Sequence, residues 1–284
     1  MKIAAQSVEL LMCMAAPGWR SKAVFRFINA MFRVIRPRRK VALNNIAQAF
    51  PEQPRSWHTQ VLKGMYAHLS WVIVEMLVLQ RDPSMAVKWV DEIEGEEFLS
   101  EALNQKRGLV LASAHFGNWE LGMAWAPQRG YPLCTIARGP NDPDLDKLLA
   151  RYRDNWGLRA FDRRAGSTST LKLAKLLKSG NFMAIAGDVH SYEGIDLPFF
   201  GRTCKTPTGA ASFALLADVQ LIPISLFRKA PFSHKAVIGA PIKIPQEGTR
   251  KERIAAVTQE INKCIENAVR LDPSLWFWLH RRWK

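Results

Sequence analysis

A histidine and a glutamate five positions apart, His115 and Glu120, are the residues of this chain best suited to acid–base chemistry. A carboxylate that hydrogen-bonds one imidazole nitrogen fixes the tautomer and raises the basicity of the ring, so the other nitrogen can take a proton from a substrate hydroxyl. On a continuous helix the two side chains would diverge by about 140°, so they can meet only if the chain turns between them. The two residue types alone are equally consistent with a catalytic pair and with a buried histidine whose carboxylate partner is structural.

The residues around this pair predict a strand, a turn and a helix. Residues 108–114 are uncharged and too few for a typical helix, which favours a buried parallel strand that ends at His115. Gly117 and Asn118 mark the turn, and Asn118 is a suitable cap for a helix that continues to Pro127. This path places the pair at the carboxyl edge of a parallel sheet, where open α/β folds bind ligands.

Two more predicted strands end at polar residues. Residues 132–137 lead to Arg138, beside a loop of Gly, Pro, Asn and Asp suited to hold an anionic group, and residues 182–186 lead to Asp188. We expect an α/β fold with a mostly parallel central sheet covered by helices on both faces, and His115 on the same edge as these two residues. Further strands are expected at residues 158–161, 219–227 and 236–240, and helices at residues 41–50, 61–81, 96–103, 145–156, 168–179, 208–217 and 254–269.

The composition favours an anionic partner. The 284 residues carry a formal net charge of +15, which attracts nucleic acid, an anionic membrane surface, or an acidic protein or substrate. Ten tryptophans together with many arginines are typical of proteins at a membrane interface. We expect no nucleic-acid partner, because no helix-turn-helix, RNA-recognition or zinc-finger pattern is present. A non-catalytic basic protein that binds nucleic acid or a membrane is the alternative from another class.

The four cysteines are scattered and form no CxxC pair. Neither a metal site nor a disulfide framework is therefore expected, and the thiols are expected to be reduced in a cytosolic compartment. We also expect no signal peptide, because Trp19 and Arg20 stand where a small-residue cleavage site would be needed.

Two regions are expected, with residues 1–40 forming basic amphipathic helices that associate with a membrane and residues 41–284 forming a single α/β domain. Residues 1–50 contain nine Lys or Arg against Glu9 alone, and apolar faces edged with basic residues suit a helix lying among anionic headgroups. The chain end, residues 276–284, mixes three tryptophans with basic residues and predicts a second interfacial segment. An ordinary pair of core helices with solvated charges is the alternative for the first region.

HFGNWE at positions 115–120 resembles the motif of glycerolipid acyltransferases in which four residues separate a histidine from an acid. Further blocks resemble one branch of these enzymes, the bacterial lipid A lauroyl and myristoyl acyltransferases. They are NNIAQAFPE at 44–52, EG at 94–95, RGPNDP at 138–143, GD at 187–188, LPFFG at 197–201, TPTG at 206–209 and WLHRRWK at 278–284. A lone HxxxxE motif is weak evidence, whereas several blocks in order are strong evidence.

The motif and the resemblance together assign roles to residues of the site. His115 would be the general base, Glu120 would orient and charge its imidazole, and backbone N–H groups at Gly117 and Asn118 would stabilise the oxyanion. The resemblance implies an arginine that binds phosphate and an aspartate that fixes this arginine; an ion pair that joins two strands is the alternative for these two residues. It also implies an aromatic pair beside the acyl chain, for which burial in the core is the alternative. The residues concerned are Arg163 or its rival Arg164, Arg138 in support, Asp188, and Phe199 with Phe200.

The reaction that this resemblance implies is transfer of a fatty acyl group from a thioester, on acyl carrier protein or CoA, to a hydroxyl of a glycolipid. No metal or other cofactor is expected, because a thioester is already activated. A lipid A precursor is the leading acceptor, with phosphatidylinositol mannoside or an aminolipid as alternatives. The expected location is the cytoplasmic face of the bacterial inner membrane, either peripheral and monotopic or through a single N-terminal anchor. An inactive relative that serves as a membrane adaptor is a further alternative.

Overall fold

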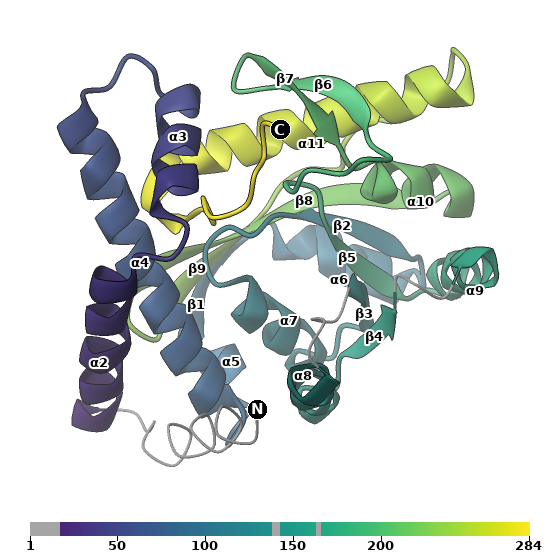
Figure 1. The fold of residues 1–284 in the computed structure, drawn as a ribbon. Coiled ribbons are helices and arrows are strands. Elements are labelled where there is room, and N and C mark those ends of the chain that lie inside the picture. The colour runs from purple at the N-terminus through teal and green to yellow at the C-terminus, as the bar shows by residue number, and fades with distance from the viewer. Residues whose placement is uncertain (1–17, 138–142, 163–165) are drawn as a thin grey trace.

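The computed structural model describes the chain except for residues 1–17, 138–142 and 163–165 (Figure 1). The substrate-binding roles predicted for Arg138, Arg163 and Arg164 therefore lie outside the described residues.

A seven-stranded sheet in the order β1-β9-β8-β2-β5-β3-β4 forms the centre of the fold (Figure 1). All neighbouring strands are parallel except β8 and β9, which confirms the expected mostly parallel sheet. The strands are β1 (Val90–Glu94), β2 (Leu109–Ser113), β3 (Leu133–Ala137), β4 (Arg159–Asp162), β5 (Phe182–Ala186), β8 (Gln220–Ala230) and β9 (Ser233–Ile238).

Helices cover both faces of this sheet, as the alternation of strands and helices predicts. Strand β2 shows why, because Val110 and Ala112 belong to one core while Leu109 and Leu111 belong to the other. The helices α9 (Gly166–Lys178), α10 (Gly209–Ala217) and α11 (Arg250–Leu271) contribute to the first core. The second core includes residues of α5 (Met85–Trp89), α6 (Glu96–Asn104), α7 (Trp119–Gln128) and α8 (Pro143–Asn155).

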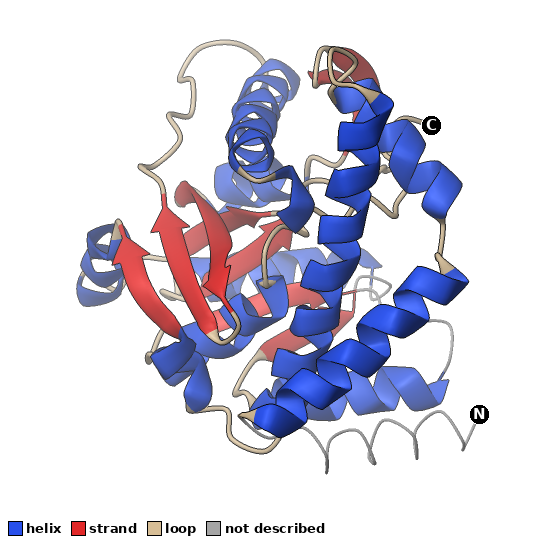
Figure 2. Cartoon of the chain, turned by 90° about the vertical axis from the view of Figure 1, so that its left-hand side faces the viewer, coloured by secondary structure: helices blue, strands red, loops and turns tan. Residues whose placement is uncertain are grey.

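Three helices precede the sheet, α2 (Trp19–Ile35), α3 (Arg39–Ala49) and α4 (Arg55–Leu79). Helix α4 extends along both cores, and α2 packs beside it (Figure 2). By length and composition alone α4 could cross a membrane, but 67% of its most apolar window is buried inside the protein. We therefore describe α4 as a core helix, which agrees with the 3.6-residue apolar period of its sequence.

Two strand regions escaped prediction. The strand β1 was not anticipated, and neither was the antiparallel hairpin of β6 (Ile195–Phe199) and β7 (Arg202–Thr206). This hairpin is a separate two-stranded sheet packed against α11, and it contains Pro198. A proline within a short apolar cluster does not predict a strand. The strand forms here because its conformation depends on packing against the helix that it covers.

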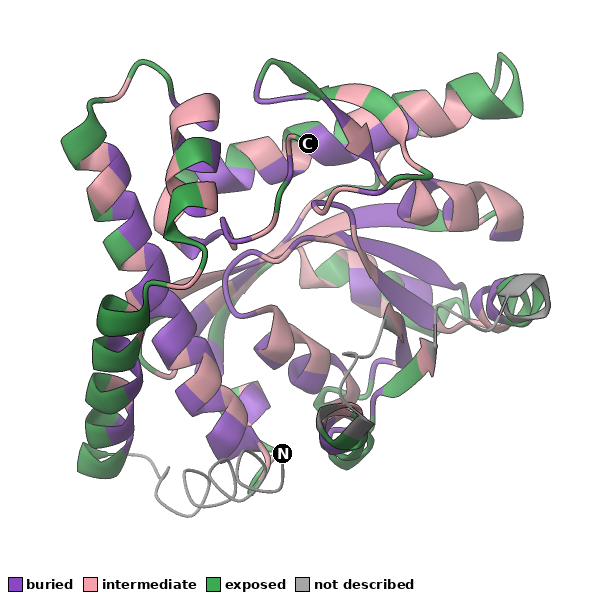
Figure 3. Ribbon diagram, viewed as in Figure 1, coloured by how far each residue is buried: buried purple, intermediate pink, exposed green. Residues whose placement is uncertain are grey.

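The interfacial prediction for the chain end is wrong. After a short 3-10 turn, Pro273–Leu275, the chain runs back through the interior, where Trp276, Trp278 and Arg282 are buried. Figure 3 shows this burial pattern, with buried segments in the middle of the molecule and the exposed face of α2 on its outside. The Arg282 guanidinium donates to the Lys205 carbonyl and to the Thr206 hydroxyl inside the protein. Sequence composition cannot separate a buried tryptophan cluster from an interfacial one, because both have the same residues.

Candidate active site

The site begins with His115 and Asp188, which lie two residues beyond the ends of the neighbouring parallel strands β2 and β5. These strands pair in register from Leu109 with Phe182 to Ser113 with Ala186. Continuing that register brings His115 opposite Asp188, and the His115 Nδ1 lies 2.9 Å from the Asp188 Oδ1. The backbone N–H of His115 also donates to Oδ2 at 2.8 Å. The convergence of strand ends predicted from sequence is confirmed for these two residues.

The Asp188 carboxylate is fully buried and receives a third hydrogen bond from the chain end. The Trp276 indole N–H donates to the Asp188 Oδ2 at 2.8 Å, and the His280 Nε2 lies 2.9 Å from the Asp188 backbone carbonyl. Burial alone would raise the pKa of this carboxyl, but the charge and hydrogen bond of His115 outweigh it and hold the pKa below its usual range. Asp188 is therefore an anion that cannot rotate away from the imidazole.

The His115 imidazole is held by Asp188 through one of its two ring nitrogens. Burial alone would lower the pKa of its imidazole, but the Asp188 carboxylate, with a smaller contribution from Glu120, raises the pKa above its ordinary value. The side chain is 33% exposed and lines a cleft, with Trp119 packed edge-on at 5.4 Å between ring centroids. Because Nδ1 is occupied by Asp188, Nε2 is the nitrogen that can exchange a proton with a substrate.

The contact predicted between Glu120 and His115 is not the one that holds the imidazole. Between these two described residues the structure has no hydrogen bond or ion pair, and the Glu120 Oε1 instead accepts from the Trp119 indole at 3.0 Å. Burial raises the pKa of the Glu120 carboxyl, against the lowering effects of Arg153, of that hydrogen bond and of His115. The helix start places Glu120 in the same cleft as His115, whereas the neighbouring strand supplies the nearer carboxylate.

Gly117 and Asn118, whose backbone N–H groups are predicted to stabilise the oxyanion, do not line the cleft. The Gly117 N–H already donates to the Leu275 carbonyl at 2.9 Å. The fully buried Asn118 caps α7 through its side-chain oxygen, which accepts from the Leu121 N–H at 3.0 Å. A Cβ on Gly117, whose φ is +58°, would lie 1.5 Å from the Leu226 carbonyl oxygen, so the turn requires glycine. Both residues shape the turn that carries His115.

The aromatic pair of the LPFFG block also lies elsewhere. Phe199 and Phe200 are buried in the core, where Phe199 packs against Trp276 and Phe200 against Phe50. Among the described residues that line the cleft neither is present. The predicted contact with substrate is wrong, and the alternative of aromatic burial is correct.

A cleft of about 570 Å³ opens beside His115. One part of its wall is apolar and comes from Met123, Ile136, Leu158, Leu173, Ile185 and Phe213, while Glu120 and Arg153 give it a polar part. Its volume lies within the range of about 300–1,000 Å³ typical of small-molecule sites. Thr208 and Gly209 of the TPTG block also line it. Sequence reasoning missed Arg153, because an arginine on an amphipathic helix is usually a solvated residue.

Trp276 and His280 were also missed as parts of the site. His280 belongs to the C-terminal block of the family resemblance at 278–284, whereas Trp276 precedes that block, and composition assigned both residues to a membrane interface. Within the described residues no group of three or more His, Cys, Asp or Glu side chains is arranged to hold a metal ion.

Fold and site together define an α/β enzyme in which a carboxylate-bound histidine, at the carboxyl edge of the sheet, faces a partly apolar cleft. The chain matches the family model described as bacterial lipid A biosynthesis acyltransferase over residues 6–284. It therefore belongs to this family and is an acyltransferase, which confirms the resemblance stated from its motifs.

Individual relatives agree with this assignment. The chain is 27% identical to the lipid A biosynthesis acyltransferase of Haemophilus influenzae, with 92% of this chain and 82% of that protein covered. It is 26% identical to the lipid A biosynthesis palmitoleoyltransferase of Escherichia coli K12, with 90% and 82% covered. It is 24% identical to the phosphatidylinositol mannoside acyltransferase of Mycolicibacterium smegmatis, with 66% of this chain and 60% of that protein covered.

Proposed function

We propose that this acyltransferase moves a fatty acyl group from an acyl thioester to a hydroxyl of a bacterial glycolipid, and that the acceptor is a lipid A precursor. The observation that carries the proposal is the His115–Asp188 pair at the wall of a partly apolar cleft. Relatives named for lipid A biosynthesis support this acceptor. A relative named for phosphatidylinositol mannoside supports a second candidate acceptor of the same chemical class.

The chemistry follows from the free nitrogen of His115. Its Nε2 removes the proton from the acceptor hydroxyl as the oxygen attacks the thioester carbonyl, and Asp188 stabilises the imidazolium that forms. When the tetrahedral intermediate collapses, the C–S bond breaks and the imidazolium returns its proton to the leaving thiolate. The products are an ester and a free thiol, and the base is regenerated. General base catalysis of this kind contributes about 10² to 10⁴ in rate.

The cleft suits an acyl chain because its wall, which includes His115, also includes several apolar side chains. Arg153 gives the same cleft a cation, and an arginine there fits a phosphate on the acceptor or on the phosphopantetheine arm of the donor. The net charge of +15 favours acyl carrier protein as donor, since that carrier is acidic and long-range attraction raises association rates. Acyl-CoA also carries negative phosphates and is the alternative donor.

Attachment to the cytoplasmic face of the inner membrane is part of this proposal, and α2 is the described element that supports it. Val24 and Ile28 of this helix pack into the core, while five of its large apolar side chains are exposed next to arginines. These exposed residues are Trp19, Phe27, Met31, Val34 and Ile35. Apolar residues edged with cations suit a helix that lies in the headgroup region of an anionic bilayer.

The experiment that tests the proposal compares total lipids by mass spectrometry from a host expressing the wild-type protein and from one expressing His115→Ala. The wild type should add one acyl mass to one glycolipid, and the mass gained identifies both acyl chain and acceptor. The variant should fold and add nothing. Equal acylation by the two proteins would overturn the role of His115. Purified protein supplied with either acyl carrier protein or CoA thioesters then identifies the donor.

A further inference from the structure

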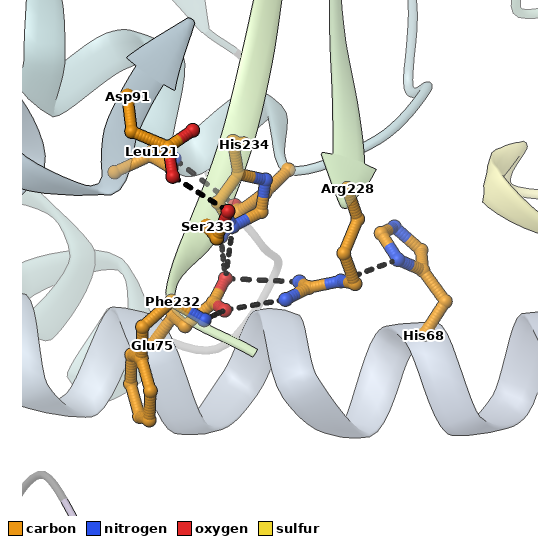
Figure 4. A network of polar contacts seen from close by, with 9 residues as sticks. His68, Glu75, Asp91, Leu121, Arg228, Phe232, Ser233 and His234 are labelled. Atoms are coloured by element: carbon orange, nitrogen blue, oxygen red, sulfur yellow. Dashed lines mark hydrogen bonds and ion pairs between the residues drawn. The ribbon is translucent and has the colours of Figure 1, made fainter. Parts of the chain in front are cut away.

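A buried polar network joins α4 to the strands β8 and β9 (Figure 4). Its centre is Glu75, a fully buried carboxylate on α4 that faces β8 and β9. The Arg228 guanidinium of β8 donates to both Glu75 oxygens, and the His234 Nε2 of β9 lies 3.0 Å from Oε2. The Phe232 N–H donates to Oε1 at 2.9 Å. This carboxylate therefore joins α4 to two strands of the sheet.

One more hydrogen bond connects Glu75 to the active site. The Asn118 Nδ2 donates to the Glu75 Oε2 at 2.6 Å, while the Asn118 Oδ1 accepts from the Leu121 N–H. Asn118 thus uses one end of its amide to cap α7 and the other end to attach that cap to α4. The first two residues of α7 are Trp119, which packs on the His115 ring, and Glu120, which lines the cleft.

The charges of this network are fixed rather than titrating in the physiological range. Burial would raise the pKa of Glu75, but Arg228 and His234 outweigh it and lower that pKa to about 2. Burial and the Arg228 charge lower the pKa of His68 to about 3, so its neutral Nδ1 accepts from the Arg228 Nε at 3.1 Å. Burial also lowers the pKa of His234. A charged, desolvated anchor of this kind holds its partners in one geometry, because any displacement leaves a charge unpaired.

We propose that Glu75 is a positioning residue for acyl transfer, which acts through Asn118 to set Trp119 and Glu120 against His115. The inference rests on the proposed function, in which His115 is the base. It assigns a role to a residue far from the HxxxxE motif in sequence and not exposed to the cleft. Misplacement of catalytic groups by about 1 Å can cost about a hundredfold in rate, so an anchor for the α7 start has a direct kinetic consequence.

The test removes the link and keeps the cap. Asn118→Ser leaves a hydroxyl that can still accept from the Leu121 N–H, but its side chain is one bond shorter than the Nδ2 arm that donates to Glu75. The matched control is Asn262→Ser, which also loses a buried Nδ2 hydrogen bond, to the Pro198 carbonyl, at a site outside the cleft. Both are assayed at a temperature well below their unfolding midpoints, so lost stability alone does not change the turnover of folded enzyme.

We expect Asn118→Ser to lower kcat by about tenfold to a hundredfold. The acid limb of its kcat/KM profile should also move to lower pH, because Glu120 shifts away from His115 and raises its pKa less. Asn262→Ser should show neither change. A folded Asn118→Ser enzyme with the kcat and pH profile of the wild type would overturn the positioning role. If His115→Ala itself turned over normally, the proposed function would fail instead, so the two failures are distinguishable.

Glu75→Gln tests Glu75 itself. It should reduce kcat at least as much as Asn118→Ser, because its amide nitrogen cannot accept the hydrogen bonds that Oε2 receives from Arg228 and Asn118. A folded Glu75→Gln enzyme with the kcat of the wild type would contradict the proposal.

Discussion

At the residue scale, the decisive feature is which carboxylate holds His115. The Asp188 carboxylate accepts a hydrogen bond from the backbone N–H of His115 and contacts the His115 Nδ1. It is fully buried, away from water. Glu120 lies in the same cleft and acts on the imidazole only through its charge. The acid of the HxxxxE motif and the acid that hydrogen-bonds the imidazole are therefore different residues.

Asp188→Asn should lower kcat by about 10² to 10⁴ because the imidazole loses its orienting anion. The general base must be deprotonated to act, and Asp188 raises its pKa, so the wild-type rate rises with pH through that raised value. Removing the carboxylate lowers the pKa of His115, and the acid limb of kcat/KM should move to lower pH. Measurement of kcat/KM against pH checks the shift, and an unmoved limb would contradict the pairing.

Glu120→Gln should move the same limb in the same direction, but by less, because its contribution to the pKa of His115 is smaller than that of Asp188. Profiles of kcat/KM against pH for the two variants, recorded with the same acyl donor and the same acceptor, show which carboxylate has the larger effect on the pKa of His115. A larger shift for Glu120→Gln than for Asp188→Asn would show that the motif acid orients the base.

At the element scale, three segments hold the turn between β2 and α7. The C-terminal chain pairs with it, since the Gly117 N–H donates to Leu275 and the Phe277 N–H donates to the His115 carbonyl. Strand β5 supplies Asp188, and α4 supplies Glu75. The active-site histidine is thus fixed by residues from three distant parts of the sequence.

Trp276→Phe should destabilise the protein and reduce kcat, because it removes the indole donor to a buried carboxylate while keeping an aromatic ring. A lost hydrogen bond to a buried anion costs about 1–3 kcal/mol in the free energy of unfolding. Urea unfolding measures that loss. Trp278→Phe is the comparison, since its indole donates to the Pro273 carbonyl and not to the site, and it should leave kcat close to that of the wild type.

Gly117→Ala should be poorly folded. A left-handed φ costs a non-glycine residue about 1–2 kcal/mol, and the added Cβ would meet the Leu226 carbonyl oxygen at 1.5 Å, so the backbone must move. Gly122→Ala in α7 is the matched control, because nothing lies within 4 Å of its Cβ position. The control should raise the free energy of unfolding by about 0.5–1 kcal/mol, as alanine does within a helix. Equal stability of the two variants would contradict the strain.

At the scale of the whole molecule, the exposed face of α2 and the net charge of +15 act together in the proposed membrane attachment. Val34→Glu should weaken binding to anionic vesicles, because it places a carboxylate on that face among anionic headgroups. Leu271→Glu, at a similarly exposed residue in the last turn of α11, is the control and should bind like the wild type. Vesicle cosedimentation at low and high salt measures both. Equal binding of Val34→Glu and wild type would place attachment elsewhere.

Local sequence by itself determined the larger part of the fold. Six of the seven sheet strands, the helix start at Asn118 and the core face of α4 followed from short apolar runs, capping residues and helical periodicity. The strand ends at His115 and Asp188 were located in the same way, and their convergence on one edge follows from parallel pairing. These features depend on residues within one or two turns of each other, where physical preferences are strong.

Only the tertiary structure decided which residues contact one another in the site and in the core. Asp188 rather than Glu120 binds the imidazole because β2 and β5 pair in a particular register, and no local pattern specifies register between strands 73 positions apart. For the same reason Phe199, Phe200 and Trp276 proved to be core residues, and Glu75 became visible as an anchor only when α4 packed on β8 and β9. Hydrogen-bond partners and burial are properties of packing, which the chain determines as a whole and no single segment determines alone.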